Sequence, residues 1–191
     1  IQIDTIRISF IDNSDSAKPE ADLTGVINLE LSNLNKILAK PFPAIKSMSL
    51  SGIVDGQFNL SGNLADFKSC SLQAKLTSSN FSLYGLNAQN LSLDFLQDQK
   101  IAKIPAMSVA FYGGIIEGFG ALNLDTPNFP YQLELNASGI KLEKLKMDTA
   151  SKNKNISGTL QGEVKVSGFL DDLNKLNGSG RLSILEGNLW E

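Results

Sequence analysis

The chain has 191 residues, of which 42% are hydrophobic and 19% charged, and its 17 basic and 20 acidic residues leave a net charge of −3. This composition predicts a folded chain, and the lack of any basic block predicts no nucleic-acid partner. The sequence contains no His and only one Cys, Cys70, which removes His-based nucleophile pairs, the usual zinc sites and any internal disulfide. We therefore expect no catalytic residues, no metal site and no cofactor, and we expect that the protein is not an enzyme.

Alternation of apolar and polar residues is the dominant pattern, and it recurs from one end of the chain to the other. Leu23, Ile27 and Leu29 alternate with polar residues early in the chain, and Val164 and Val166 do so near its end. Strands of this kind have one apolar and one wet face, which is typical of an antiparallel sheet. We predict an all-β fold with minor short helices. Roughly a dozen strands at about 4.8 Å spacing would form a sheet that has to twist, curl or close.

Turn-forming residues separate the predicted strands at short intervals. The predicted turns lie at Asn13–Asp15, Gly62–Asn63, Gly85, Asp98–Gln99, Gly113–Gly114, Asp125–Asn128 and Asn177–Gly178. Short helices are expected at residues 33–39, 142–147 and 172–176, the first ended by Pro41 and Pro43. Cys70 is expected to be a small, half-buried residue at the start of a strand.

A strand unit rich in Ser and Gly occurs twice. Residues 51–62 read SGIVDGQFNLSG and residues 157–168 read SGTLQGEVKVSG. The offset of 106 residues continues beyond the unit, so the duplicated segment covers 51–76 and 157–182, with a polar turn predicted around Asp66 and around Asp172. Glycines on the apolar side of a strand let the backbone bend or a ligand approach it. The glycines expected to act in this way are Gly52, Gly56, Gly62, Gly113, Gly114, Gly158, Gly162 and Gly168.

The segment FYGGIIEGFG at 111–120 resembles the Tyr-Gly-Gly hairpin of the AsmA-like family, which includes TamB- and YhdP-type proteins. The motifs that follow it strengthen the resemblance: PYQLEL at 130–135, SGI at 138–140, ISGTLQG at 156–162, DLNKLNGSG at 172–180 and LEGNL at 185–189. Their order and spacing are similar to the carboxy-terminal module of that family. The resemblance covers about residues 45–191, and residues 1–44 match only by their strand pattern.

The resemblance implies a long, curled antiparallel sheet that forms an open groove or half-barrel with a continuous apolar face. Members of the family are anchored in the inner membrane of diderm bacteria, project into the periplasm and are implicated in phospholipid movement towards the outer membrane. It therefore implies a periplasmic location, a membrane anchor in the parent protein, partners in the envelope, and a phospholipid or other acyl lipid as ligand. We expect residues 1–44 to form leading strands and a short helix, and residues 45–191 to form the groove module.

The candidate groove-lining residues are the apolar members of the alternating strands. They are Val54, Phe58, Leu60, Phe81, Leu83, Leu91, Leu93, Phe95, Val109, Phe111, Leu133, Leu135, Val164 and Val166. The alternative for each is an ordinary protein core, in a β-sandwich or solenoid that serves as a spacer or docking module. Because the chain begins at Ile1 inside a predicted strand, we expect one continuous piece of a larger protein, whose exposed sheet edges can pair with another copy.

Overall fold

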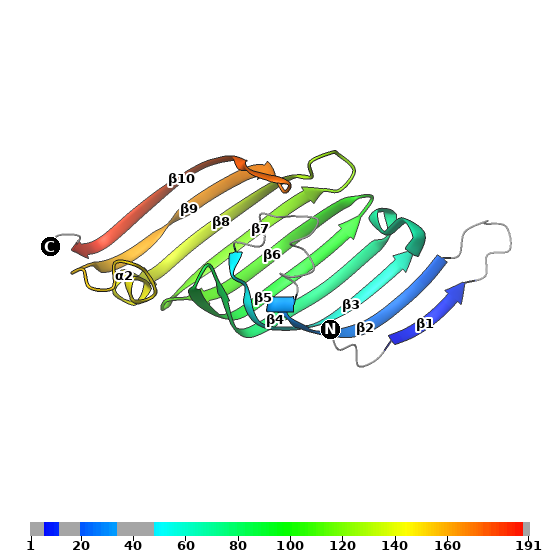
Figure 1. The fold of residues 1–191 in the computed structure, drawn as a ribbon, viewed down its shortest axis with the longest axis horizontal. Helices are drawn as coiled ribbons and strands as arrows, with labels where there is room; N and C mark the ends of the chain where they lie inside the picture. The colour runs from blue at the N-terminus through cyan, green and yellow to red at the C-terminus, as the bar shows by residue number, and fades with distance from the viewer. Residues whose placement is uncertain (1–5, 12–19, 34–47, 189–191) are drawn as a thin grey trace.

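The computed structural model describes residues 6–11, 20–33 and 48–188, and these form one arched sheet of ten strands (Figure 1). Each strand pairs antiparallel with its neighbours in the sequence, so β1 and β10 are the two free edges. The prediction of an all-β fold with an open, curled antiparallel sheet is confirmed. The strands are β1 (Ile6–Ile11), β2 (Glu20–Glu30), β3 (Ser51–Gly62), β4 (Ser71–Leu83), β5 (Leu86–Asp98), β6 (Ile101–Phe111), β7 (Gly114–Asn123), β8 (Pro130–Lys141), β9 (Ser157–Phe169) and β10 (Asp172–Asn188).

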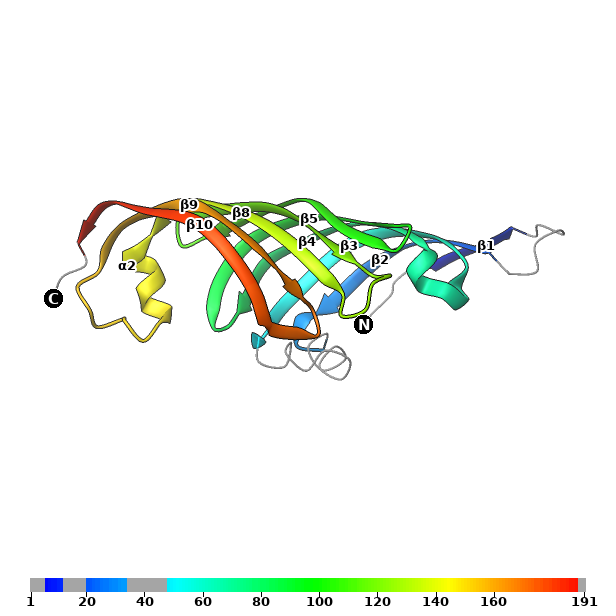
Figure 2. The ribbon, with the colours of Figure 1, turned by 90° about the horizontal axis from the view of Figure 1, so that it is seen from above.

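Short helices lie at the two opposite rims of this sheet. Helix η2 (Leu64–Ser69) joins β3 to β4, whereas α2 (Leu142–Leu145) and η3 (Lys146–Asp148) follow β8. In an antiparallel meander successive connections alternate between rims, so η2 marks one rim, here called the η2 rim, and α2 marks the other, the α2 rim. Figure 2 shows both helical segments on the inner side of the arch. The predicted helix at 142–147 is confirmed.

Three local predictions are wrong. Residues 172–176 form no helix because β10 begins at Asp172, and Asn177–Gly178 forms no turn because Asn177 pairs with Ser167 inside the same strand. The turn lies instead at 170–171, where the Leu170 N–H donates to the carbonyls of Asn128 and Phe129 in the neighbouring connection. Asp66 lies in η2 rather than in a turn. The predicted turn at 13–15 and residues 34–39 of the predicted first helix lie outside the described residues.

The strand register brings the candidate lining residues to one side of the sheet, although exposed apolar side chains such as Ile115 and Phe119 lie on the other. Leu23, Leu60 and Leu72 are cross-strand partners, and Leu133 with Val166 continues the same side at the other end. Polar partners such as Asn28 and Asp55 occupy the opposite side. Because Gln97, a residue of the apolar side, donates its amide to carbonyls of η2, this side faces the interior of the arch. We call it the apolar face and the other side the polar face.

Single-residue bulges interrupt the ladders and keep the apolar residues on the apolar face. Around Pro105, the ladder of β6 with β5 has one extra residue on β6 between Lys103 and Ala106. The ladder of β6 with β7 likewise has one extra residue on β6, between Ile104 and Met107. Proline has no N–H to donate to a ladder, so a bulge is the place where a strand tolerates it. A second bulge lies at Gly139 of β8, which has a φ of +71°. Bulges bend a strand and increase its twist, so they contribute to the arch.

The duplicated sequence unit is also a structural repeat. The register of β9 with β10 repeats that of β3 with β4 at the offset of 106 residues, so Gly56 faces Leu76 just as Gly162 faces Leu182. A Cβ on Gly56 would lie 2.5 Å from Leu76 Cδ2, and one on Gly162 would lie 2.9 Å from Leu182 Cδ2. Both glycines therefore provide the space that the facing leucine occupies. At about 4.8 Å per strand, the two copies are roughly 29 Å apart along the sheet.

We predict that Gly56→Ala lowers the free energy of unfolding by about 1–3 kcal/mol, because its Cβ would also meet the Lys75 carbonyl oxygen at 2.6 Å. The matched control is Gly178→Ala, where the nearest atom is the Lys165 carbonyl oxygen at 3.6 Å and a loss below about 0.5 kcal/mol is expected. Urea unfolding of both variants measures the difference. Equal losses would contradict the assignment of Gly56 as the space for Leu76.

Candidate functional site

All of the candidate lining residues lie on the apolar face. Phe58 faces Ala74, Ala74 faces Phe95, and Leu93 faces Met107, which shares its side of β6 with Val109 and Phe111. Gly118 and Gly120 of β7 then connect this side to Leu135 and Leu133, which face Val164 and Val166. Val54, Leu60 and Val109 are buried, Leu83 is 38% exposed, and the others are half-buried. The residues that alternate in the sequence therefore form one continuous surface.

This surface is covered by no second sheet among the described residues, which form one layer. Proteins normally bury the apolar side of a sheet against another layer of structure. Here neighbouring side chains cover one another instead. Leu135 Cδ2 lies only 2.6 Å from the position that a Cβ on Gly118 would take, and Met107 Cε lies 3.4 Å from it. Side chains from both flanking strands therefore cover Gly118, and the apolar face is continuous across β7.

Several residues of the apolar face escaped the sequence analysis. The most buried of them is Ile140, at 2% exposure, which faces Leu160 across the β8–β9 ladder. It follows the bulge at Gly139, where the alternation changes phase, so a strict period of two assigns Ile140 to the wrong side. A glycine inside a strand pattern is a local signal for such a change, as is a proline such as Pro105. Ile116 and Met107 lie on the same face and were also missed.

At the η2 rim, the end of the apolar face is closed by a buried polar contact. Gln97 is 3% exposed, and its Nε2 donates to the carbonyl oxygens of Phe67 at 2.8 Å and Cys70 at 3.3 Å. Cys70 is fully buried rather than half-buried as predicted, because it ends η2 and its Sγ donates to the Asn63 carbonyl at 3.2 Å. Burial, and then the charge of Asp66, raise the pKa of this thiol. Cys70 is therefore part of the packing of η2.

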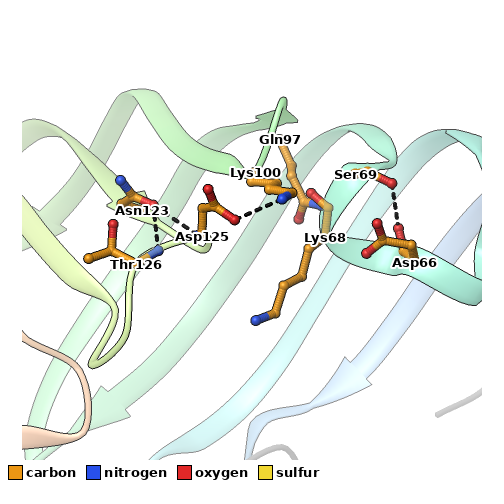
Figure 3. A network of polar contacts seen from close by, with 8 residues as sticks. All are labelled: Asp66, Lys68, Ser69, Gln97, Lys100, Asn123, Asp125 and Thr126. Atoms are coloured by element: carbon orange, nitrogen blue, oxygen red, sulfur yellow. Dashed lines mark hydrogen bonds and ion pairs between the residues drawn. The ribbon is translucent and has the colours of Figure 1, made fainter.

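The charged groups of the η2 rim include one ion pair, between Lys100 and Asp125 (Figure 3). Lys100 Nζ lies 2.7 Å from Asp125 Oδ1, and this hydrogen bond raises the pKa of Lys100 and lowers that of Asp125. The side chain of Asn123 accepts from the N–H groups of Asp125 and Thr126 at 2.9 and 3.1 Å. Lys68 lies 5.2 Å from the centre of the Phe129 ring. The connections at this rim thus form one polar network.

At the α2 rim, a carboxylate fastens the helical segment to the sheet. Tyr112 O–H and Asn87 Nδ2 both donate to Asp148 Oδ2, and the Asn87 N–H donates to the Tyr112 hydroxyl oxygen at 2.9 Å. The hydrogen bond from Tyr112, and then that from Asn87, lowers the pKa of Asp148. Burial, and then the hydrogen bond to Asp148, raises the pKa of Tyr112. Tyr112 belongs to the Tyr-Gly-Gly turn between β6 and β7, so that motif holds η3 against two hairpins.

Two of the hollows among the described residues lie on the polar face. One of about 840 Å³ crosses β2 to β6, and most of the side chains that line it, such as Gln57, Asn59 and Lys75, belong to the polar face. Another of about 430 Å³ crosses β6 to β9 beside Glu134 and Lys165. These are furrows between rows of side chains of the polar face, which here include Val26, Leu96 and Phe119. The apolar face is a broad surface instead, which suits an elongated apolar ligand better than a compact one.

Within the described ranges, no three His, Cys, Asp or Glu side chains are grouped so that they could hold a metal ion. None of the helices in the same ranges is long and apolar enough to cross a bilayer. The geometry therefore draws attention to the apolar face and its two rims.

Comparison with known proteins identifies the family. The model of the AsmA family matches residues 46–190, which is most of the chain. The chain belongs to the AsmA family. No curated protein and no solved structure matches it significantly. AsmA proteins are associated with the bacterial envelope, and the resemblance noted in the Tyr-Gly-Gly segment and the motifs after it is thereby confirmed.

We predict that Gln97→Leu destabilises the AsmA chain by about 1–3 kcal/mol, because the carbonyls of Phe67 and Cys70 would lose a buried donor. Hydrogen exchange should show the loss locally, as faster exchange of the Cys70 amide, which donates to Phe67. Gln89→Leu on the exposed side of the same strand is the control and should leave both readouts unchanged. Unaltered exchange in η2 after Gln97→Leu would contradict the contact.

The Asp148 contact predicts a dependence on pH. Because the folded-state pKa of Asp148 is lowered, its stabilisation is present above the ordinary pKa of 3.8 and is lost as the pH falls through the lowered value. Protection of residues 142–156 from hydrogen exchange should therefore fall below pH 3.8. Tyr112→Phe should move the pKa of Asp148 towards 3.8 in a carboxyl NMR titration, and Tyr84→Phe, at an exposed turn, should not. An unmoved pKa in Tyr112→Phe would refute the contact.

Proposed function

We propose that the apolar face binds the acyl chains of phospholipids, as part of a lipid-transport bridge across the bacterial envelope that supports the integrity of the outer membrane. The observation that carries this proposal is the apolar face of a ten-stranded single layer, which no second sheet covers in the described residues. Burial of apolar surface stabilises by about 0.8 kcal/mol per methylene. A bound acyl chain would therefore supply the covering layer.

The dimensions of the sheet favour a track over a single binding site. Ten strands at about 4.8 Å spacing extend roughly 43 Å across the sheet. One leaflet of a bilayer contributes about 15 Å of hydrocarbon, half of a core about 30 Å thick. The apolar face is therefore wide enough to hold more than one lipid along the sheet. Lipid would move along it by diffusion, with the head group at a wet rim and with no covalent step and no enzymatic activity.

Family membership supports the cellular setting of this proposal. The chain would be a periplasmic part of a larger protein anchored in the inner membrane, with envelope partners at the ends of the track. The competing function, a spacer or docking module with an ordinary core, requires a layer of protein on the apolar face. The described residues of this chain contain no such layer, which favours the lipid groove.

Native mass spectrometry and lipid extraction of the purified chain test the proposal, and near-stoichiometric phospholipid is expected. Phe58→Glu and Leu93→Glu should abolish uptake of a fluorescent fatty acid, because an unpaired charge would enter the apolar face. The matched controls Asn59→Glu and Ser92→Glu, each one residue away, should retain uptake.

A wild-type chain that contains no lipid and takes up no fatty acid would exclude the groove in favour of the spacer. Circular dichroism of all four variants accompanies the assay. Unfolding of both Phe58→Glu and Leu93→Glu would instead indicate a sealed core.

A further inference from the structure

The α2 rim is strongly basic. Residues 141–154 contain five lysines against one Glu and one Asp. The lysines are Lys141, Lys144, Lys146, Lys152 and Lys154. This is the densest group of basic residues in a chain whose net charge is −3. Its position matters because it borders the apolar face, next to the buried Ile140.

The two acidic residues of this segment neutralise only part of the charge. The hydrogen bonds that Asp148 accepts come from neutral donors, Tyr112 and Asn87. Backbone hydrogen bonds, first its own and then that of Gly158, lower the pKa of Glu143, and the charges of Lys141 and Lys144 lower it further. A net positive charge therefore remains along the rim.

The segment is also held in place. Lys141 Nζ donates to Thr159 Oγ1 at 2.8 Å, and Lys146 Nζ donates to the Lys154 carbonyl at 2.6 Å. Asp148 attaches η3 to the hairpins of β4–β5 and β6–β7. Lys141 and Asp148 join the segment to the sheet, and the bond from Lys146 to Lys154 closes the segment on itself. The lysine-bearing backbone is thereby fixed beside the apolar face.

The η2 rim differs in charge. Its described connections, at 63–70, 99–100, 124–129 and 170–171, contain three Asp and two Lys residues. Both lysines are occupied, Lys100 by Asp125 and Lys68 by the ring of Phe129. In the described connections, the positive rim and the more acidic rim therefore face each other across the apolar face.

We propose that the α2 rim is the binding site for the phosphate group of an anionic phospholipid whose acyl chains lie on the apolar face. Lysines attract anionic lipid head groups, and the effect adds for each lysine near the phosphate. The charge difference between the rims would then orient the lipid, with its head group at α2 and its tails pointing along the strands towards the η2 rim. This inference rests on the proposed function of the apolar face and adds to it the position and charge of the head group.

The test compares two fluorescent lipids with the same acyl tails, phosphatidylglycerol and diacylglycerol, which lacks the phosphate. We expect the wild-type chain to bind phosphatidylglycerol more tightly, and Lys144→Gln/Lys152→Gln to weaken that binding by about five- to twentyfold. Diacylglycerol binding should change less than about twofold. Added salt should weaken phosphatidylglycerol binding in the wild type and have little effect in the variant.

Two further variants control the experiment. Lys75→Gln/Lys103→Gln removes the same charge from the exposed polar side of β4 and β6 and should leave both affinities unchanged. Lys144→Arg/Lys152→Arg keeps the charge and should retain the preference for phosphatidylglycerol, which separates a loss of charge from a loss of fold.

Each result decides between distinct conclusions. Equal binding of both lipids, unaffected by Lys144→Gln/Lys152→Gln, would overturn the head-group site and leave the acyl groove in place. Binding of neither lipid would overturn the proposed function and this inference together.

Titration with inorganic phosphate distinguishes a site for a lipid phosphate from a site for free phosphate. Phosphate that binds the rim as tightly as phosphatidylglycerol does would mark a free-anion site and overturn the lipid assignment.

Discussion

The uncovered apolar face is the constraint on which the rest of this structure depends. A sheet with one apolar side normally gains its stability by packing against a second layer, and the described part of this chain provides one layer only. The arch offsets part of this deficit, because the inner side of a curved sheet brings neighbouring side chains together. Val54, at 6% exposure, and Val109, at 7%, are buried in this way. The curvature of the sheet therefore buries part of the apolar surface that a second layer would otherwise cover.

Glycines and bulges are the features that make this curvature compatible with a dense inner surface. A glycine inside a strand normally weakens it, because it adds backbone entropy and packs no side chain. On the inner side of an arch the missing side chain becomes useful, since Leu76 occupies the space above Gly56 and Leu182 the space above Gly162. The same packing of a leucine over a glycine occurs at positions 106 residues apart, so the duplicated sequence places this feature in the sheet twice.

Local sequence patterns were sufficient for the strands, their apolar side and most turns, because alternation and turn residues are properties of short segments. They failed where a contact distant in sequence decides the structure. Asn177–Gly178 has the composition of a turn but is held in β10 by its pairing with β9. Helix η2 has no apolar periodicity and depends on Gln97, which lies about thirty residues away in the chain. Ile140 was missed because the bulge at Gly139 shifts the alternation by one residue.

The division between apolar face and charged rims bears on how such a protein distinguishes its ligands. Hydrophobic burial is non-directional and roughly proportional to area, so the apolar face alone would accept any acyl chain of suitable length. Discrimination between lipids has to come from polar groups at defined positions. In this chain such groups are concentrated at the rims, where Asp148 and Gln97 fix the helical segments to the sheet. Under the proposed function, a lipid would slide along the apolar face while the rim selects its head group.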